Sequence, residues 1–209
     1  MWHCFLEWEV VMNSNYVFVS PHKAVVNGKA IECQSEGKQL LLEVYRTHIG
    51  GYPKFFKMDP LCQLGFVASE LLVKELGNRD LSDCAVILFN RSSSYCNDRM
   101  YQETIQDNGN FFPSPSIFVY TLPNIVTGEI AIKNKIFGET SFYLLDRFDP
   151  EYIAKVVATS FAGTASRKVI CGWVDCYSEN DFMASLAYFE NEQVELDTIE
   201  KTFELINSI

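Results

Sequence analysis

The segment PSPSIFVYTLPNIVTGEIAIKNKIFGET, residues 113–140, decides the fold that this sequence predicts. It reads as a turn, a helix over about 123–135 that Thr121 caps, and a glycine, Gly138, that closes the helix before the next strand. Gly128 inside the helix lowers its stability unless a neighbouring backbone approaches closely. The segment therefore positions whatever residues follow Gly138.

Strands are predicted on both sides of this segment. Cys84–Phe89 and Thr140–Leu145 are continuous apolar runs, which are typical of strands buried on both faces of a sheet. Lys168–Val174 predicts another strand, with Phe182–Phe189 antiparallel beside it, and a turn at residues 27–28 predicts a hairpin near the start.

Helices alternate with these strands. The best-defined helix has Asp59 as its cap, Pro60 in its first turn and Gly77 at its end. Three more are predicted at about 100–105, 150–161 and 197–207. The alternation predicts an α/β fold, with a mixed, mostly parallel sheet and helices on both faces.

The sequence shows no internal repeat, low-complexity tract or linker. We therefore expect one domain over residues 1–209, with residues 1–15 as a candidate N-terminal extension and either Met1 or Met12 as the natural start. The N-terminus lacks the basic region and the apolar stretch of a signal peptide. No run approaches the ~20 apolar residues of a membrane span, so no span is expected.

The charge balance is acidic, with 17 Lys and Arg against 27 Asp and Glu and a formal net charge of −10. Phosphate backbones are repelled on average, so nucleic acid is not an expected partner. Acyl carrier proteins are also acidic, and docking one would need a local basic patch that the sequence does not reveal.

Seven cysteines are scattered along the chain without a C-x-x-C pair. Cys171 and Cys176 are separated by four residues and have no nearby histidine to complete a zinc site. These features predict reduced thiols, a cytoplasmic protein, and neither a metal nor a cofactor.

Three stretches together resemble the N-terminal half of β-ketoacyl synthases, which have a thiolase-like fold. They are FKMDPLCQLGFVASELL at residues 56–72, the opening segment, and KVICGWVD at residues 168–175. The opening segment is the most specific, because Pro123, Asn124 and Gly128 are in step with the family pattern. The resemblance covers roughly 55–175 and implies half of a thiolase-like fold.

In that family, the strand after the glycine carries a nucleophilic cysteine on a tight turn into a buried helix. Counting from Gly138, the matching position falls at or next to Arg147, within LLDRFDPE, and no thiol is present. The family also needs two histidines from a second half-domain, whereas His3, His22 and His48 lie upstream. The resemblance therefore implies a degenerate nucleophile turn at residues 146–148 and no condensing activity for this chain alone.

The turn residues Asp146, Arg147 and Phe148 have several interpretations. Asp146 and Arg147 could be a remnant site, a partner-facing ion pair or part of a plain helix cap, and the cap is favoured for Asp149. For Arg147 we favour an interface, or a structural pair that fills the vacated pocket.

The aromatic residues of the opening segment are candidates for a second role. In the family, this region lies along the dimer interface and lines the acyl tunnel, while a general core role is the alternative for residues 111–112 and 118–120. The candidate interface or acyl-pocket residues are Phe112, Ser116, Phe118, Tyr120, Pro123 and Asn124.

The first functional hypothesis is a non-catalytic ketosynthase-like accessory protein of bacterial fatty-acid, polyketide or aryl-polyene pigment synthesis. Its expected partners are a second copy or a full-length ketosynthase, with an acyl carrier protein as a further candidate. The second hypothesis is an acyl-thioester transferase or hydrolase that uses Asp146 as acid/base and Cys96 or Ser94 as nucleophile. The third is a degenerate domain without a ligand.

Association is expected because members of this family bury each half-domain against the other, helix layer on helix layer. A solitary half would expose apolar helix faces, which are rare on soluble monomers. Another chain, or the segment after Asp175, is expected to cover them.

Overall fold

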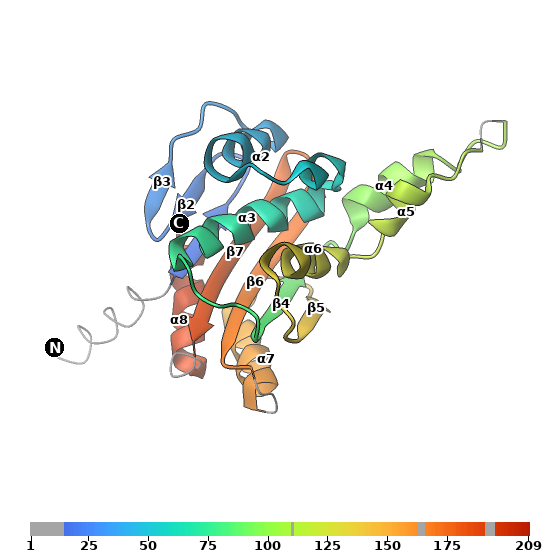
Figure 1. Ribbon diagram of the computed structural model, residues 1–209. Helices are drawn as coiled ribbons and strands as arrows, with labels where there is room; N and C mark the ends of the chain where they lie inside the picture. The colour runs from blue at the N-terminus through green and yellow to red at the C-terminus, as the bar shows by residue number, and fades with distance from the viewer. Residues whose placement is uncertain (1–14, 110, 163–165, 191–194) are drawn as a thin grey trace, which may run out of the picture.

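A seven-stranded mixed sheet organises the computed structural model, which describes residues 15–109, 111–162, 166–190 and 195–209 (Figure 1). The strand order is β3-β2-β1-β7-β6-β4-β5. The strands are β1 (Asn15–Val19), β2 (Ala24–Val26), β3 (Lys29–Ile31), β4 (Cys84–Asn90), β5 (Thr140–Leu144), β6 (Lys168–Ser178) and β7 (Asp181–Glu190). The expected extension lies outside the described residues except for Asn15, which already belongs to β1.

Parallel pairing is confined to one end of the sheet, where β4 lies between β5 and β6. All the other pairs are antiparallel, including the predicted pair of β6 with β7 and the predicted hairpin of β2 with β3. Asn27 and Gly28 both have positive φ, at 48° and 77°, as a tight two-residue hairpin turn requires. The predicted α/β fold with a mixed sheet is confirmed, but the sheet is mostly antiparallel and not mostly parallel as predicted, because β1, β2, β3 and β7 pair only antiparallel.

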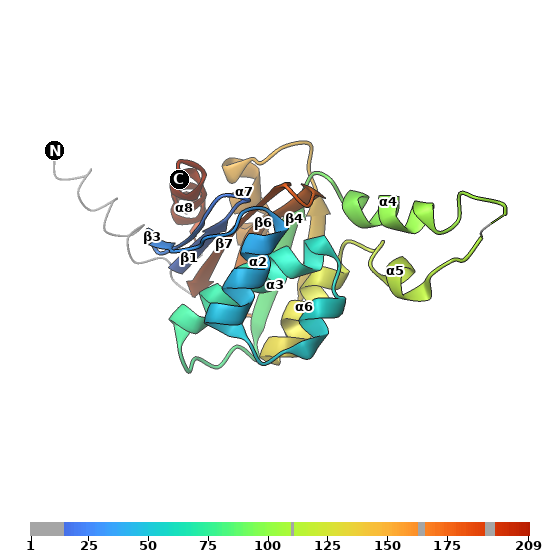
Figure 2. The same cartoon turned by 90° about the horizontal axis from the view of Figure 1, so that it is seen from above.

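Helices cover both faces of the sheet, as predicted (Figures 1 and 2). One face carries α2 (Lys38–Val44), α3 (Pro60–Leu76) and α6 (Ile125–Asn134), together with the π-helix η1 (Tyr45–Ile49) and the 3-10 helix η2 (Pro53–Lys57). The other face carries α7 (Pro150–Ala162) and α8 (Leu196–Asn207). Each layer buries its own apolar cluster against the sheet.

Helix α3 forms where its local signals predict. The Asp59 side chain accepts hydrogen bonds from the backbone amides of Leu61 and Cys62, Pro60 opens the first turn, and Gly77 follows the last residue with φ 65°. The helix buries an apolar face against the sheet, and this face includes Leu61, Leu64, Ala68, Leu71, Leu72 and Leu76.

An arm projects from this body, formed by α4 (Tyr95–Glu103), α5 (Pro115–Val119) and the described residues between them (Figure 2). Helix α4 begins earlier than the 100–105 that the sequence predicted. Ser114 caps α5, where its hydroxyl accepts from the amide of Ile117 at 3.4 Å. The opening segment therefore contains two helices instead of one.

The start of the predicted 123–135 helix is wrong. Helix α6 begins at Ile125, and the Thr121 hydroxyl donates to the Phe118 carbonyl oxygen at 2.7 Å instead of capping it. Beyond the helix, Gly138 is needed for a close approach, because an added Cβ would lie 2.2 Å from the Cys84 carbonyl oxygen. The glycine thus seats the end of the segment against the start of β4.

Strand β5 is not buried as predicted. It is the edge strand beyond β4, and all of its residues are half-buried or exposed. Residues 139 and 145 bond to β4, through the Val86 amide to the Glu139 oxygen and the Leu145 amide to the Asn90 oxygen. Since alternate residues of a strand face opposite neighbours, the backbone groups of Thr140, Phe142 and Leu144 point to the open edge.

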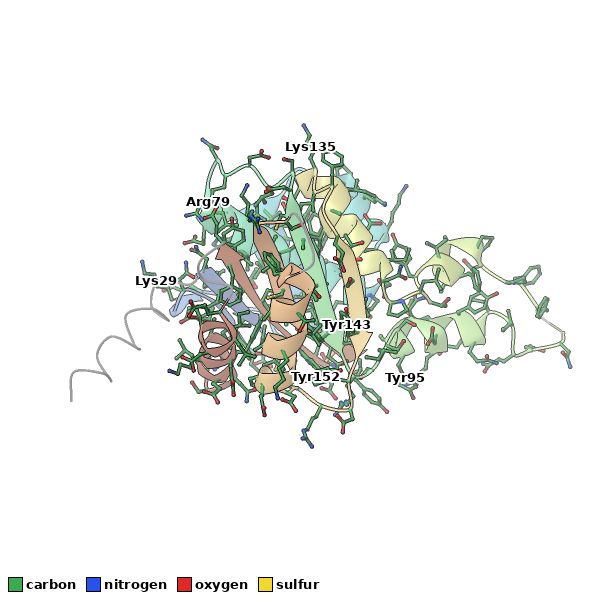
Figure 3. All side chains as sticks on the ribbon, turned by 90° about the horizontal axis from the view of Figure 1, so that it is seen from below. Lys29, Arg79, Tyr95, Lys135, Tyr143 and Tyr152 are labelled. Carbon is green, nitrogen blue, oxygen red and sulfur yellow. The ribbon has the colours of Figure 1, made fainter. Side chains whose placement is uncertain are left out.

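The α7–α8 layer presents a mostly polar outer surface, contrary to the expected apolar helix faces (Figure 3). The exposed side of α7 carries Glu151 and Lys155, which form an i,i+4 ion pair, and only Tyr152 is a large exposed apolar residue there. On α8, Lys201 pairs with Asp197 at 2.9 Å. Helix α8 contacts α7, so the chain's own C-terminal helix shares with α7 the covering of this face of the sheet; it does not lie over the outer faces of the helices.

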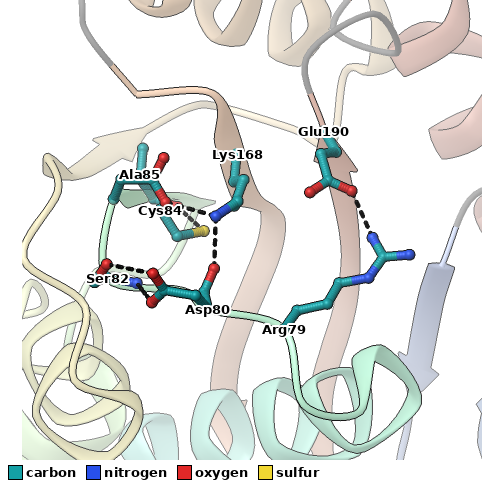
Figure 4. A network of polar contacts seen from close by, with 8 residues as sticks. Arg79, Asp80, Ser82, Cys84, Ala85, Lys168 and Glu190 are labelled. Atoms are coloured by element: carbon teal, nitrogen blue, oxygen red, sulfur yellow. Dashed lines mark hydrogen bonds and ion pairs between the residues drawn. The ribbon is translucent and has the colours of Figure 1, made fainter.

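A polar network joins the starts of β4 and β6 to the end of β7 (Figure 4). The Lys168 ammonium donates to the Asp80 carbonyl oxygen at 2.6 Å and to the Asp83 carboxylate at 2.8 Å, while Arg79 reaches Glu190 at 2.6 Å. This network anchors the loop between α3 and β4 where β4 and β6 begin, at the opposite end of these strands from the candidate site.

Candidate functional site

The turn between β5 and α7 lies where the spacing from Gly138 predicted it. Leu145 remains tied to the end of β4 by its amide bond to Asn90, at 2.8 Å. Residues 146–148 then change direction, and the Asp149 carboxylate accepts from the Tyr152 amide at 3.0 Å in the first turn of α7. The predicted cap at Asp149 is confirmed.

The three turn side chains point to different surroundings. Arg147 is 74% exposed and lies 3.7 Å from the Asp149 carboxylate, so it does not fill a vacated pocket. Asp146 is exposed as well. Phe148 instead turns inward and packs edge-on against Trp173 and Phe203, with ring centroids 5.6 and 6.2 Å apart. The buried ring of Phe148 and the solvent-facing guanidinium of Arg147 therefore lie at the position that the resemblance assigns to a nucleophile.

The Asp175 side chain anchors the loop that follows β4. The Asp175 carboxylate accepts from the amides of Arg91 and Ser92, at 3.2 and 2.7 Å, and from the Ser92 hydroxyl at 3.2 Å. The Arg91 guanidinium lies 3.9 Å from the same carboxylate. Asp175 thus holds this loop at the carboxyl ends of β4 and β6.

The groups named for an enzymatic role are engaged elsewhere. Ser94 is buried, and its hydroxyl donates to the Thr121 carbonyl oxygen at 2.6 Å. The thiol of Cys96 is hydrogen-bonded to Cys176. His22 faces Glu36 at 3.7 Å in the loop between β1 and β2, and β7, β6 and β4 separate β1 from the edge strand β5. The structure does not bring these groups together with Asp146.

The candidate interface residues lie along the arm and at the start of α6. Phe112 and Phe118 are 72% and 52% exposed, and Ser116 and Asn124 are exposed as well, while Pro123 and Tyr120 are half-buried. Phe111 is also exposed, so the core role considered for residues 111–112 and 118 is wrong. Burial, with a contribution from Glu129, raises the pKa of Tyr120 to about 12.

Sequence reasoning missed three exposed apolar residues near the same edge of the sheet. Phe137 is 82% exposed just before β5, Leu144 is 57% exposed in β5, and Ile132 is 67% exposed on α6. Together with the exposed apolar residues of the arm and of the turn after α5, they make up the set that we call the edge surface, namely Phe111, Phe112, Phe118, Val119, Leu122, Ile132, Phe137 and Leu144. These residues are far apart in the sequence, so no local pattern marks them. Their common exposure follows from the position of β5 at the edge of the sheet, which only the strand order shows.

Sequence reasoning also missed an ion pair between the half-exposed Lys54 and the buried Glu129. The Lys54 ammonium lies 2.6 Å from Glu129, whose side chain is 5% exposed. Within the described part of the chain, the second Glu129 carboxylate oxygen has no hydrogen-bond partner. Sequence alone gave no signal for this pair, because η2 and α6 are far apart along the chain.

In the parts of the chain that the structure describes, no three His, Cys, Asp or Glu side chains are grouped to hold a metal ion. Nor does any described helix have the length and apolar character required to cross a bilayer.

Solved structures that share this fold include two that are described as ketosynthase proteins. One, described as "The ishigamide ketosynthase/chain length factor", superposes with a TM-score of 0.62 at 15% identity, over 86% of this chain and 62% of that chain. Another, "Ketosynthase (ApeO) in Complex with its Chain Length Factor (ApeC) from Xenorhabdus doucetiae", gives 0.57 at 10% identity, over 93% of this chain and 90% of that one.

The chain has a ketosynthase-type, thiolase-like half fold. It spans less than two thirds of the length of the ishigamide protein chain. No known family model matches the sequence, and no curated protein matches it. The likeness therefore rests on the three-dimensional structure.

Proposed function

We propose that this chain, as one ketosynthase-N-terminal-like domain over residues 1–209, is a non-catalytic partner subunit that binds a ketosynthase. The observation that carries the proposal is the edge surface, where an open strand and exposed aromatic residues adjoin. Both structures of the same fold contain a protein described as a ketosynthase with a chain length factor. The pathway we propose is polyketide or polyene synthesis.

The open edge supplies backbone groups for a partner strand. Thr140, Phe142 and Leu144 direct amides and carbonyl oxygens away from β4. Unpaired strand edges readily add another strand, and natural proteins usually protect them. An apolar and aromatic surface beside such an edge has the composition of an interface centre.

The distribution of exposed apolar residues selects this side of the molecule. The outer side of the α7–α8 layer is mostly polar and carries i,i+4 ion pairs. Phe112, Phe118 and Phe137 by contrast expose more than half of their surface at the arm and the β5 side. A partner therefore gains most by burying the edge surface.

The turn residues support a binding role over a catalytic one. Arg147 is always protonated and cannot act as a nucleophile, and Phe148 fills the adjoining apolar space. We place the exposed Asp146 and Arg147 at the margin of the partner interface. An acidic carrier protein is a weaker candidate partner, given the net charge of −10.

The test is co-purification of the full chain with a ketosynthase from the same source organism, followed by an affinity measurement. We expect a stable heteromer and no covalent acyl adduct by mass spectrometry after incubation with acyl-carrier thioesters. An acyl-chain adduct on this chain would support the transferase hypothesis instead. A homodimer that excludes the ketosynthase would overturn the heteromer.

Two variants locate the interface. Phe118→Ser removes an exposed aromatic from the arm and is expected to cost about 2 kcal/mol, or roughly thirtyfold in affinity. Leu144→Pro removes one outward amide without touching the bonds between β5 and β4. Tyr152→Ser on α7 is the matched control, because Tyr152 is 49% exposed against 52% for Phe118. Equal losses for Phe118→Ser and Tyr152→Ser would refute the placement.

A further inference from the structure

Two cysteines from different elements meet at the base of the arm. Cys96 lies in the first turn of α4, and Cys176 lies near the end of β6. Their sequence neighbours Tyr95 and Tyr177 stack with ring centroids 4.8 Å apart and planes 13° from parallel, so the two dipeptides lie side by side (Figure 3 labels Tyr95). Both cysteines are free thiols.

The two thiols have unequal surroundings. The hydrogen bond with Cys176 lowers the pKa of Cys96, and this effect exceeds the opposing burial and the charges of Asp59 and Glu179. The same hydrogen bond and burial raise the pKa of Cys176, and the Ser178 carbonyl oxygen, 3.5 Å from its sulfur, is an alternative acceptor for its single proton. One sulfur is thus favoured as the thiolate, and the other is held protonated beside it.

Only Cys96 of this pair is open to solvent. It is half-buried and lines a cavity of about 300 Å³, together with Arg99, Met100, Glu103 and Tyr177, whereas Cys176 is 2% exposed. Among the other described cysteines, Cys62, Cys84 and Cys171 are buried. Cys33 is half-buried like Cys96, but burial and Glu43 raise its pKa. Cys96 is therefore the thiol that a small oxidant meets in reactive form.

We propose that Cys96 and Cys176 are a redox-responsive pair that a peroxide converts into a disulfide linking α4 to β6. The Cys96 thiolate attacks one oxygen of hydrogen peroxide, the O–O bond breaks, and a sulfenic acid and hydroxide form. That hydroxide takes the proton of Cys176 to form water, and the resulting thiolate attacks the Cys96 sulfur. The hydroxide displaced from Cys96 takes up the proton that Cys96 released on ionising and leaves as the second water. In total, two thiols and one peroxide give a disulfide and two waters.

The proposed disulfide between Cys96 and Cys176 would restrain the arm. Helix α4 is the root of the arm, and β6 is a central strand of the sheet (Figure 1). A covalent link between them restrains the direction in which α4 leaves the body. The disulfide requires only the thiol pair and its surroundings, and it does not require a ketosynthase partner.

The test treats the reduced full chain with a slight excess of hydrogen peroxide, caps the remaining thiols and maps peptides by mass spectrometry. We expect a peptide pair joined through Cys96 and Cys176, lost on reduction, with intact mass lower by two hydrogens. Cys96→Ser and Cys176→Ser should each abolish it, and Cys33→Ser, the matched control, should retain it. Free thiols at both positions, or over-oxidation of Cys96 without a cross-link, would overturn the proposal.

Two further readouts separate the pair from a merely buried thiol. Alkylation of Cys96 at neutral pH should be several-fold faster than that of Cys33, and Cys176→Ala should slow it several-fold by removing the hydrogen bond. Proteolysis of the arm should be several-fold slower in the oxidised chain. Equal alkylation of Cys96 with and without Cys176 would contradict the assigned role of Cys176.

Discussion

Replacing Gly128 by alanine is expected to stabilise the chain. Gly128 lies in the interior of α6, and an added Cβ would meet nothing within 4 Å. Glycine is about 0.8–1.0 kcal/mol less favourable than alanine in a helix interior. The substitution should therefore raise the free energy of unfolding by about 1 kcal/mol, which corresponds to about 2–4 °C in Tm for a chain of this size.

The measurement is a thermal melt by circular dichroism, with urea unfolding to confirm that the midpoint moves and the slope does not. Gly138→Ala is the matched control, since the same methyl group would there lie 2.2 Å from the Cys84 carbonyl oxygen and 2.7 Å from its carbon. Backbone of a central strand cannot move aside, so we expect a loss of about 1–3 kcal/mol. The same glycine-to-alanine substitution should thus raise the free energy of unfolding at Gly128 and lower it at Gly138.

A lower Tm for Gly128→Ala would refute the open surroundings assigned to α6. A different result would be informative about the partner. If the variant is more stable alone but binds the ketosynthase more weakly, the partner backbone approaches α6 at Gly128, and the glycine is retained for binding.

Three further predictions concern charged groups. Lys54→Met leaves the buried Glu129 unpaired and should cost about 3 kcal/mol in urea unfolding, whereas adding Glu129→Gln should recover part of that loss; no recovery would mean that the ion pair is not the cause. Burial raises the pKa of Asp59, so the folded state binds its proton more readily than the unfolded state does. The charged Asp59 therefore disfavours folding at neutral pH. This cost disappears as the pH falls through the folded pKa toward about 4. Asp59→Asn keeps a capping side chain, so its stability relative to the parent should be higher at pH 7 than at pH 4, and a difference that does not vary with pH would contradict this. Arg147→Ala should change the free energy of unfolding by less than about 0.5 kcal/mol, since its pair with Asp149 is exposed, while a larger loss would show a structural role.

The sequence predicted those parts of the fold that local signals determine. Helix α3 has its cap, its first-turn proline and its terminal glycine within the element itself. Strand β5 shows the limit, because an apolar run indicates a strand but not its place in the strand order. The helix start at Ile125 was also missed. The packing of the arm, and not the local sequence, decides which of residues 121–124 ends the turn before the helix.

The position of the turn at residues 146–148 was predicted, but the directions of its side chains were not. Spacing from Gly138 located the turn at residues 146–148, since a strand and a tight turn fix the count. The opposite directions of Arg147 and Phe148 depend on Trp173 and Phe203, which come from β6 and α8. Likewise, the meeting of Cys96 with Cys176 depends on how α4 packs on β6 and leaves no sequence signature.

The projecting arm has a consequence for how such a protein can diversify. Its exposed aromatic side chains lie outside both core clusters, so their replacement leaves the buried sheet and its helix layers untouched. Substitutions on the arm can therefore change which protein it binds without lowering the free energy of unfolding of the sheet and its helix layers. Duplicated copies could acquire separate companions through changes in α4 and α5 alone.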